Sequence, residues 1–146
     1  MAGFTIRDPA FRDKVRTSFD SQTFMRTLGV RMKELEPGRC VLEMPTRPDL
    51  CQQNGFVHAG ATTAIADTAA GYAAFSLTEP GANILTVEFK MNLLNPADGE
   101  MLVARAEVIK SGRTLMVVRS DVIARKNGAD SPVAAMLATM MSLPAP

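Results

Sequence analysis

Alternating apolar and polar residues characterise the second half of the chain. Between Leu85 and Leu93 every second residue is apolar, and each residue in between is polar or charged. This period of two predicts a β-strand with one apolar face. Similar patterns predict three further strands, over residues 100–110, 114–126 and 132–143. Turn signals separate them, at residues 95–99, 111–112 and 126–128.

A long, nearly uncharged segment, 57–77, precedes these strands. It consists mainly of Ala, Gly and Thr, and Asp67 lies at its centre. Its length would suffice to cross a bilayer, but an Asp at the middle of a membrane helix costs about 2.5–3.5 kcal/mol. We therefore predict a helix that is buried on most sides inside a water-soluble protein, and no membrane association. Residues 79–81, Glu-Pro-Gly, end this helix.

The N-terminal part of the chain predicts short elements. Helices are expected over 8–19 and 21–28, and strands over 30–36 and 39–45. Ser21 is the expected N-cap of the second helix and Gly29 its stop. We expect residues 1–146 to form one domain, in which 1–28 is an N-terminal helical segment.

The order of the elements predicts the fold. Consecutive strands joined by short turns favour an antiparallel sheet. The sheet has one apolar face to cover, and only the 57–77 helix is long enough to do so. The small residues of that helix allow close approach to the sheet. We therefore predict an α+β hot-dog fold, in which a curved antiparallel sheet of about six strands wraps around one long central helix.

Composition and charge exclude several classes of protein. Hydrophobic residues make up 47% of the chain and charged residues 21%, which is typical of a globular domain and excludes a disordered chain. Sixteen Lys and Arg residues against 15 Asp and Glu residues give a net charge of +1. This balance argues against nucleic acid as a partner.

Cys40 and Cys51 are the only cysteines, and His58 is the only histidine. Two cysteines do not make a disulfide framework, and the N-terminus does not resemble a secretory signal. We therefore expect free thiols and a cytoplasmic location. A zinc site made of protein ligands alone is not expected, and we expect no metal or other cofactor.

The segment around the start of the long helix carries a family resemblance. Gln52, Gly55, His58 and Asp67 have the spacing of the acyl-CoA thioesterases of the phenylacetate-degradation (PaaI-like) type, which the chain resembles from about residue 24 to its end. That family has His-Gly-Gly where this chain has His-Ala-Gly. The first Gly of the family offers its N–H to the thioester oxygen, and Ala59 can do so only if its backbone does not need a positive φ.

The resemblance implies an acyl-CoA substrate and a homodimer that assembles as a dimer of dimers. We expect Asn54, Gly55, Gly71 and Arg113 to bind this substrate. Arg113 is a candidate to hold a CoA phosphate, as are Lys90 and Arg125. An ordinary exposed charge at a strand end is the alternative for each of these three cations.

Asp67 is the most informative residue for chemistry. Its neighbours at helical spacing are small, so they leave a slot around the carboxylate. A carboxylate in a partly dry slot is a suitable nucleophile or general base at a thioester carbonyl, and burial raises its pKa. The alternative is a buried Asp that is hydrogen-bonded to Thr63 or Thr68. The residues do not decide between direct attack and activation of water.

The start of the long helix offers the complementary chemistry. Its first N–H groups are free and carry the positive end of the helix dipole, so Ala59 is the candidate oxyanion donor, with Gly60 as the second choice. Gln52 is expected to orient the carbonyl or the water, unless it is simply a solvated loop residue. His58 suits a helix-positioning role better than acid–base catalysis.

Spacing along the helix predicts how these residues meet. Asp67 lies eight residues after Ala59, or roughly 12 Å along the helix axis, so one carbonyl cannot touch both residues of the same chain. We therefore predict an obligate dimer with two equivalent sites at its interface. Hydrolysis of an acyl-CoA thioester is the leading function. A hot-dog hydratase or dehydratase and a non-catalytic acyl-CoA-binding module are the alternatives.

Overall fold

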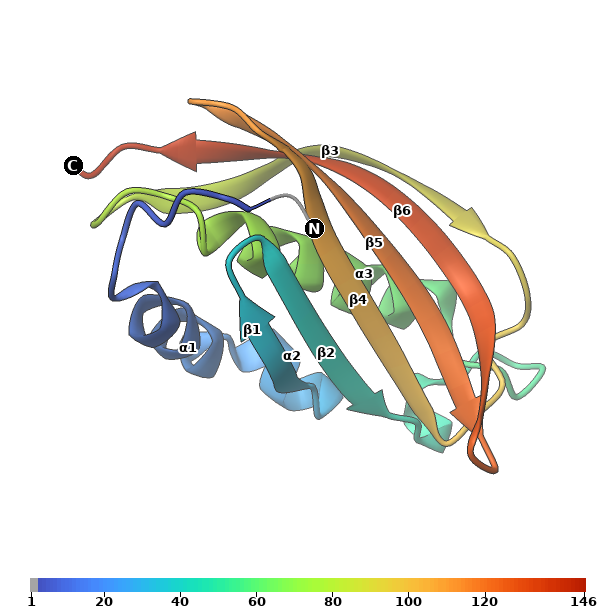
Figure 1. Cartoon of the computed structure of the whole chain (residues 1–146). Coiled ribbons are helices and arrows are strands. Elements are labelled where there is room, and N and C mark those ends of the chain that lie inside the picture. The colour runs from blue at the N-terminus through green and yellow to red at the C-terminus, as the bar shows by residue number, and fades with distance from the viewer. Residues whose placement is uncertain (1–2) are drawn as a thin grey trace.

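The computed structural model describes residues 3–146 and contains a single sheet with three α-helices (Figure 1). The helices are α1 (Phe11–Ser21), α2 (Thr23–Leu28) and α3 (Ala59–Phe75). The strands are β1 (Arg31–Glu36), β2 (Arg39–Pro45), β3 (Asn83–Leu93), β4 (Met101–Ser111), β5 (Leu115–Lys126) and β6 (Ala129–Leu143). A short 3-10 turn, Pro48–Leu50, lies in the segment between β2 and α3.

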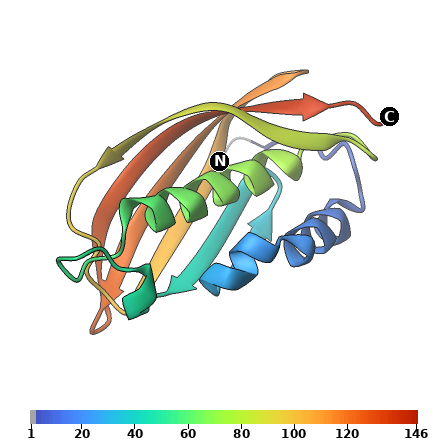
Figure 2. The same cartoon turned by 180° about the vertical axis from the view of Figure 1, so that it is seen from behind.

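The sheet is antiparallel throughout, with the strand order β1-β2-β4-β5-β6-β3. It curves around α3, which runs along its concave face (Figures 1 and 2). The predicted hot-dog fold is therefore confirmed. β1 and β3 are the two edge strands of this sheet. β3 follows α3 in the chain and pairs with β6, not with β2 or β4, its neighbours in sequence.

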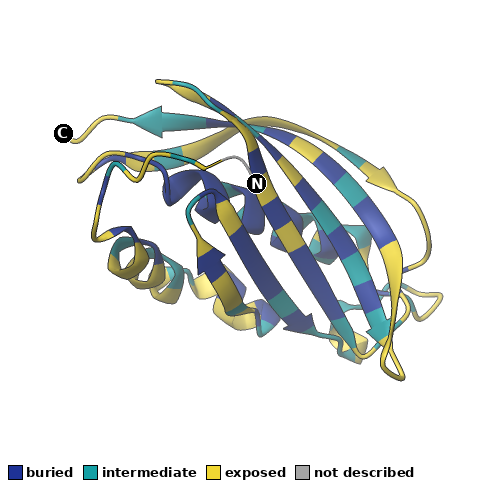
Figure 3. Ribbon diagram, in the orientation of Figure 1, coloured by how far each residue is buried: buried dark blue, intermediate teal, exposed yellow. Residues whose placement is uncertain are grey.

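Small residues let α3 sit close to the sheet. Ala66, Ala69, Ala70, Ala73 and Ala74 are completely buried, and buried residues recur along β2, β4, β5 and β6 (Figure 3). The helix spans a shorter range than predicted, because His58 caps its start and Ser76 its end. One side of α3 is not covered by the sheet. Along it lie half-buried residues at helical spacing: Thr63, Ala64, Asp67, Thr68 and Gly71.

Most strands follow their predicted pattern, but β3 does not. In β5, the even-numbered Met116, Val118 and Val122 face α3 and are buried. In β3, by contrast, four apolar residues are between 45% and 58% exposed: Leu85, Val87, Phe89 and Leu93. The expectation that α3 covers the apolar face of the sheet therefore fails at this edge.

A β-bulge between Thr86 and Glu88 breaks the alternation of β3. Thr86 pairs with Met140 and Phe89 pairs with Ala138, and both partners face the interior. The extra residue thus turns Thr86 and Phe89 to the same side of the sheet, although strict alternation would place them on opposite sides. Thr86 consequently faces α3.

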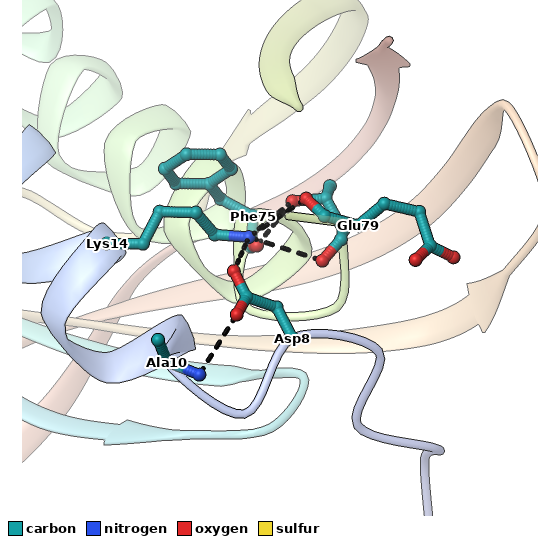
Figure 4. A network of polar contacts seen from close by, with 6 residues as sticks. Asp8, Ala10, Lys14, Phe75 and Glu79 are labelled. Atoms are coloured by element: carbon teal, nitrogen blue, oxygen red, sulfur yellow. Dashed lines mark hydrogen bonds and ion pairs between the residues drawn. The ribbon is translucent and has the colours of Figure 1, made fainter. Parts of the chain in front are cut away.

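The two N-terminal helices lie along the open side of α3, opposite β3 (Figure 2). Lys14 on α1 anchors them: its ammonium lies 2.8 Å from Asp8 Oδ2 and donates to the Thr78 and Glu79 carbonyls beyond the end of α3 (Figure 4). This hydrogen bond to Lys14 holds the pKa of Asp8 below its usual value. The pair therefore ties α1 to the C-terminal end of α3.

The predicted cap of the second helix was wrong. Gln22 occupies the N-cap position of α2, whereas Ser21 ends α1 and its hydroxyl donates to the Ser18 carbonyl. Gly29 does end α2, in the left-handed region at φ 73° as predicted. α2 thus has only six residues, and the Gln22 side chain does not hydrogen-bond to the helix start that it precedes.

Candidate active site

The predicted site residues fall into two groups, in two separate cavities of the chain. Asp67 lies in a cavity of about 360 Å³ between α3, the N-terminal helices and β3. Gln52, His58 and Ala59 line another, of about 510 Å³, at the N-terminal end of α3. The two cavities share no lining residue. Within one chain, the acidic group and the predicted oxyanion donors are therefore apart.

Asp67 is held by a neighbour that the sequence did not suggest. Thr86 Oγ1 donates a hydrogen bond of 2.8 Å to Asp67 Oδ1, whereas Thr63 and Thr68 do not bond to this carboxylate. The second oxygen, Oδ2, accepts no hydrogen bond from the described residues. Burial raises the pKa of Asp67, and the hydrogen bond from Thr86 partly offsets this rise. The result is a half-buried carboxylate with one oxygen fixed and the other available.

His58 caps the start of α3. Its Nδ1 accepts a 2.8 Å hydrogen bond from the Gly60 N–H, as expected for a residue that positions the helix. A side chain at Gly60 would crowd this cap, because a Cβ there would lie 2.9 Å from Nδ1. The Gly60 N–H is therefore already engaged.

Ala59 keeps the free donor at the helix start. Its N–H has no acceptor within residues 3–146, and Ala59 lines the cavity as the first residue of α3. Its backbone is right-handed helical, so the Ala that replaces Gly in the family pattern adopts this position without strain. The N–H thus combines a free hydrogen-bond donor with the positive end of a 17-residue helix.

Gln52 belongs to a tight turn that leads into α3. Its backbone N–H donates to the Phe56 carbonyl, and its side-chain oxygen accepts from the Asn54 N–H. Gly55 completes the turn at φ 85°, a conformation that strongly favours glycine. Gln52 lines the same cavity as Ala59, its side-chain oxygen is fixed, and its NH₂ group donates no hydrogen bond within residues 3–146.

The remaining predicted residues divide between the two groups and the outer surface. Gly71 lines the Asp67 cavity, and a Cβ placed there would meet no atom within 4 Å. Asn54 and Gly55 belong to the exposed turn of Gln52. Arg113 is exposed in the turn between β4 and β5 and lines neither cavity.

Sequence reasoning missed Thr86, Gln22 and Tyr72, which also line the Asp67 cavity. Thr86 was assigned to the polar face of its strand, and only the bulge reverses that assignment. Gln22 and Tyr72 carry no motif that could have revealed them.

The described part of the chain has neither a metal-binding cluster nor a membrane-spanning helix. Residues 3–146 contain no group of three or more His, Cys, Asp or Glu side chains placed to hold a metal ion. None of their helices is both long enough and apolar enough to cross a bilayer. Burial raises the pKa of the Cys40 thiol to about 12, so this cysteine is an inert core residue.

Comparison with known proteins identifies the family. The sequence model of the Thioesterase superfamily matches residues 54–130, a region that includes His58, the whole of α3 and β3 to β5. The chain belongs to the thioesterase superfamily. The prediction of an enzyme of the thioester-hydrolase class agrees with this membership.

Similar proteins extend this assignment within the superfamily. The human protein "Acyl-coenzyme A thioesterase 13" is 27% identical over 126 residues, which are 85% of this chain and 89% of that protein. A thioesterase family protein from Silicibacter pomeroyi is 51% identical, with a TM-score of 0.90 over 91% of this chain and 98% of that one. The PaaI protein of E. coli shares the fold, with a TM-score of 0.85 at 18% identity over 97% and 98% of the two chains.

Proposed function

We propose that this thioesterase-superfamily protein hydrolyses an acyl-CoA thioester to the free carboxylic acid and CoA, with Asp67 as the reactive carboxylate. The observation that carries the proposal is the Asp67 carboxylate itself. It is half-buried in a cavity, has a raised pKa, is held by Thr86 through one oxygen and presents the other. The likeness to human acyl-coenzyme A thioesterase 13 supports CoA thioesters as the substrate class.

Asp67 has two routes to the same products. As a nucleophile, its free oxygen attacks the thioester carbon, the C–S bond breaks, and CoA leaves as a thiolate; water then cleaves the resulting anhydride. As a general base, it takes a proton from a water molecule whose oxygen attacks the same carbon. Both routes need an ionised carboxylate close to the carbonyl, and both develop negative charge on the carbonyl oxygen.

The start of α3 suits the stabilisation of that charge. The Ala59 N–H is free, lies at the positive end of the helix dipole and lines a cavity. Gln52 lines the same cavity, and its NH₂ group can hold the carbonyl or the water in place. We assign Ala59 as the oxyanion donor and Gln52 as the orienting group. Gly60, whose N–H serves the cap, supports them through His58.

A complete site needs both groups, so we propose that it forms between two subunits. The carboxylate of one chain and the α3 N-terminus of its partner then face one carbonyl, because roughly 12 Å of helix separates them within a chain. The exposed apolar residues of the β3 edge support this arrangement. An edge strand presents unpaired backbone N–H and C=O groups that can pair with a strand of another chain, and apolar side chains favour such an association. We further propose that two such dimers associate into a tetramer.

Among the candidate cations for a CoA phosphate, Arg113 and Lys90 remain available. Arg125 is engaged by Asp130 through two hydrogen bonds, of 2.8 and 3.1 Å. Arg113 and Lys90 are both exposed, and neither forms an ion pair within residues 3–146. We therefore propose these two as the phosphate-binding residues.

The test is a panel of acyl-CoAs of different lengths and shapes, assayed with a thiol reagent. Wild-type protein is expected to release free CoA, and Asp67→Ala is expected to lose at least a hundredfold in kcat/KM. Asp98→Ala is the matched control, because Asp98 is an exposed carboxylate whose one ion-pair partner within residues 3–146 is Lys126. Tight binding without CoA release would instead indicate an acyl-CoA-binding module. Consumption of an unsaturated acyl-CoA without CoA release would indicate a hydratase.

A further inference from the structure

The cavity that contains Asp67 has a second polar end. Ser18, Gln22 and Tyr72 line it together with Asp67, although they come from α1, the α1–α2 junction and α3. Gln22 Nε2 donates a 2.8 Å hydrogen bond to the Tyr72 hydroxyl, and Ser18 Oγ lies 3.3 Å from the same hydroxyl. The walls between the two polar ends are largely apolar: Met25, Ile84, Leu85 and Met140.

This polar trio has unused hydrogen-bonding capacity. The Gln22 side-chain oxygen accepts no hydrogen bond from residues 3–146. The Tyr72 hydroxyl accepts from Gln22, so its own proton is free for Ser18 or for a ligand. Burial raises the pKa of Tyr72, which keeps the phenol protonated as a donor. The trio therefore offers both an acceptor and a donor to a group in the cavity.

The spacing of Asp67 and Tyr72 along α3 indicates the size of the group that fits. Tyr72 lies five residues after Asp67 on α3, or roughly 7.5 Å along the helix axis. Gly71 lies between them and leaves the space open, since a Cβ there meets no atom within 4 Å. The cavity volume of about 360 Å³ is at the small end of ligand pockets, which suits a compact acyl group rather than a long chain.

We propose that Gln22 and Tyr72, with Ser18, determine substrate specificity by binding a hydroxyl or similar polar group at the far end of a compact acyl chain. This inference rests on the proposed function, because it takes the cavity beside Asp67 as the acyl pocket. A site built to hydrogen-bond a substrate hydroxyl discriminates strongly against the analogue that lacks it, since the buried polar groups of the site are then unpaired.

The probes are hexanoyl-CoA and 6-hydroxyhexanoyl-CoA, which differ only in a terminal hydroxyl. Wild-type protein is expected to favour the hydroxylated thioester at least tenfold in kcat/KM. Tyr72→Phe and Gln22→Met, which keep the shape of the side chains, are expected to lower kcat/KM for the hydroxylated thioester at least fivefold more than kcat/KM for hexanoyl-CoA. Ser21→Ala is the control, because its exposed hydroxyl makes one hydrogen bond within the described part of the chain, to the Ser18 carbonyl.

A purely structural role for the trio gives a different result. Both thioesters would then lose activity together in Tyr72→Phe and Gln22→Met, in step with a lower melting temperature, and that outcome overturns the inference. Binding of the two thioesters to Asp67→Ala, measured by calorimetry, provides a second readout that needs no turnover. If the two thioesters bind with equal affinity, the specificity inference alone is overturned. If the binding preference is present but wild-type protein releases no CoA, only the proposed hydrolysis is overturned.

Discussion

Thr86 Oγ1 lies 2.8 Å from Asp67 Oδ1 and connects the β3 edge strand to the middle of α3. The contact exists because a β-bulge turns Thr86 inward at this point of the strand. It fixes one oxygen of the carboxylate and also limits how far burial raises the pKa of Asp67. Geometry and ionisation of the proposed reactive group therefore depend on the same hydroxyl.

Replacement of Thr86 by Val should shift the pH dependence of the enzyme. The hydrogen bond from Thr86 favours the charged form of Asp67, so its loss raises the pKa further above the ordinary value. Since the ionised carboxylate is the active form, the acidic limb of kcat/KM against pH is expected to move to higher pH in Thr86→Val. Thr86→Ser keeps the hydroxyl and should reproduce the wild-type limb. An unshifted limb in Thr86→Val would show that this contact does not control Asp67.

Ala59→Pro tests the oxyanion donor without breaking the helix. Proline is well accepted at the first position of a helix, and His58 already has the extended backbone, φ −60° and ψ 139°, that precedes proline favourably. The substitution removes only the N–H. We expect kcat to fall about 10²–10³-fold with little change in the melting temperature. Full activity of this folded variant would exclude Ala59 N–H as the donor.

Mixing two inactive variants tests whether the site is shared between subunits. If one chain contributes Asp67 and the other Ala59, a mixed dimer of Asp67→Ala and Ala59→Pro chains contains one intact site. Random re-association at equal concentrations should then restore roughly a quarter of wild-type activity, because half of the dimers are mixed and one of their two sites is intact. No recovery is expected if both groups act within one chain.

Gly71 should separate stability from activity. A Cβ at this position lies in open space, and Ala in place of Gly inside a helix stabilises by roughly 0.5–1 kcal/mol. The new methyl groups would occupy the acyl cavity. We expect Gly71→Ala to unfold at a higher urea concentration and yet to have a lower kcat/KM, with a larger loss of kcat/KM in Gly71→Val. Unchanged kinetics in both variants would mean that the substrate does not enter this cavity.

Two buried serines should respond to alanine in opposite ways. Ser120 is completely buried on β5 and its hydroxyl has no hydrogen-bond partner among residues 3–146, a situation that costs roughly 1–3 kcal/mol. Ser120→Ala is therefore expected to raise the free energy of unfolding by about 1 kcal/mol, as measured by urea denaturation. Ser76 is equally buried, but its hydroxyl donates to the Ala73 carbonyl and accepts from the Gly38 N–H. Ser76→Ala should lower the stability, and a loss in both variants would indicate that Ser120 has a partner after all.

The sequence by itself determined the architecture of this protein. The period-two patterns of β4 and β5 and the alanine-rich composition of α3 are local properties, and they dictate a sheet packed against one close helix. The position of Asp67 in the middle of that helix, and of His58 at its start, followed from the same local spacing. These two positions were enough to predict that the carboxylate and the helix N-terminus lie far apart along the helix axis of one chain.

Tertiary structure alone decided what surrounds the carboxylate. Thr86 reaches Asp67 because of a bulge, which depends on pairing with β6 and leaves no pattern in the sequence of β3. Gln22 and Tyr72 meet because α1 and α2 fold back along α3, a contact between residues 50 positions apart. Periodicity reports which face of one element is apolar. It does not report which elements meet in space, and the polar contacts of this cavity depend on that meeting.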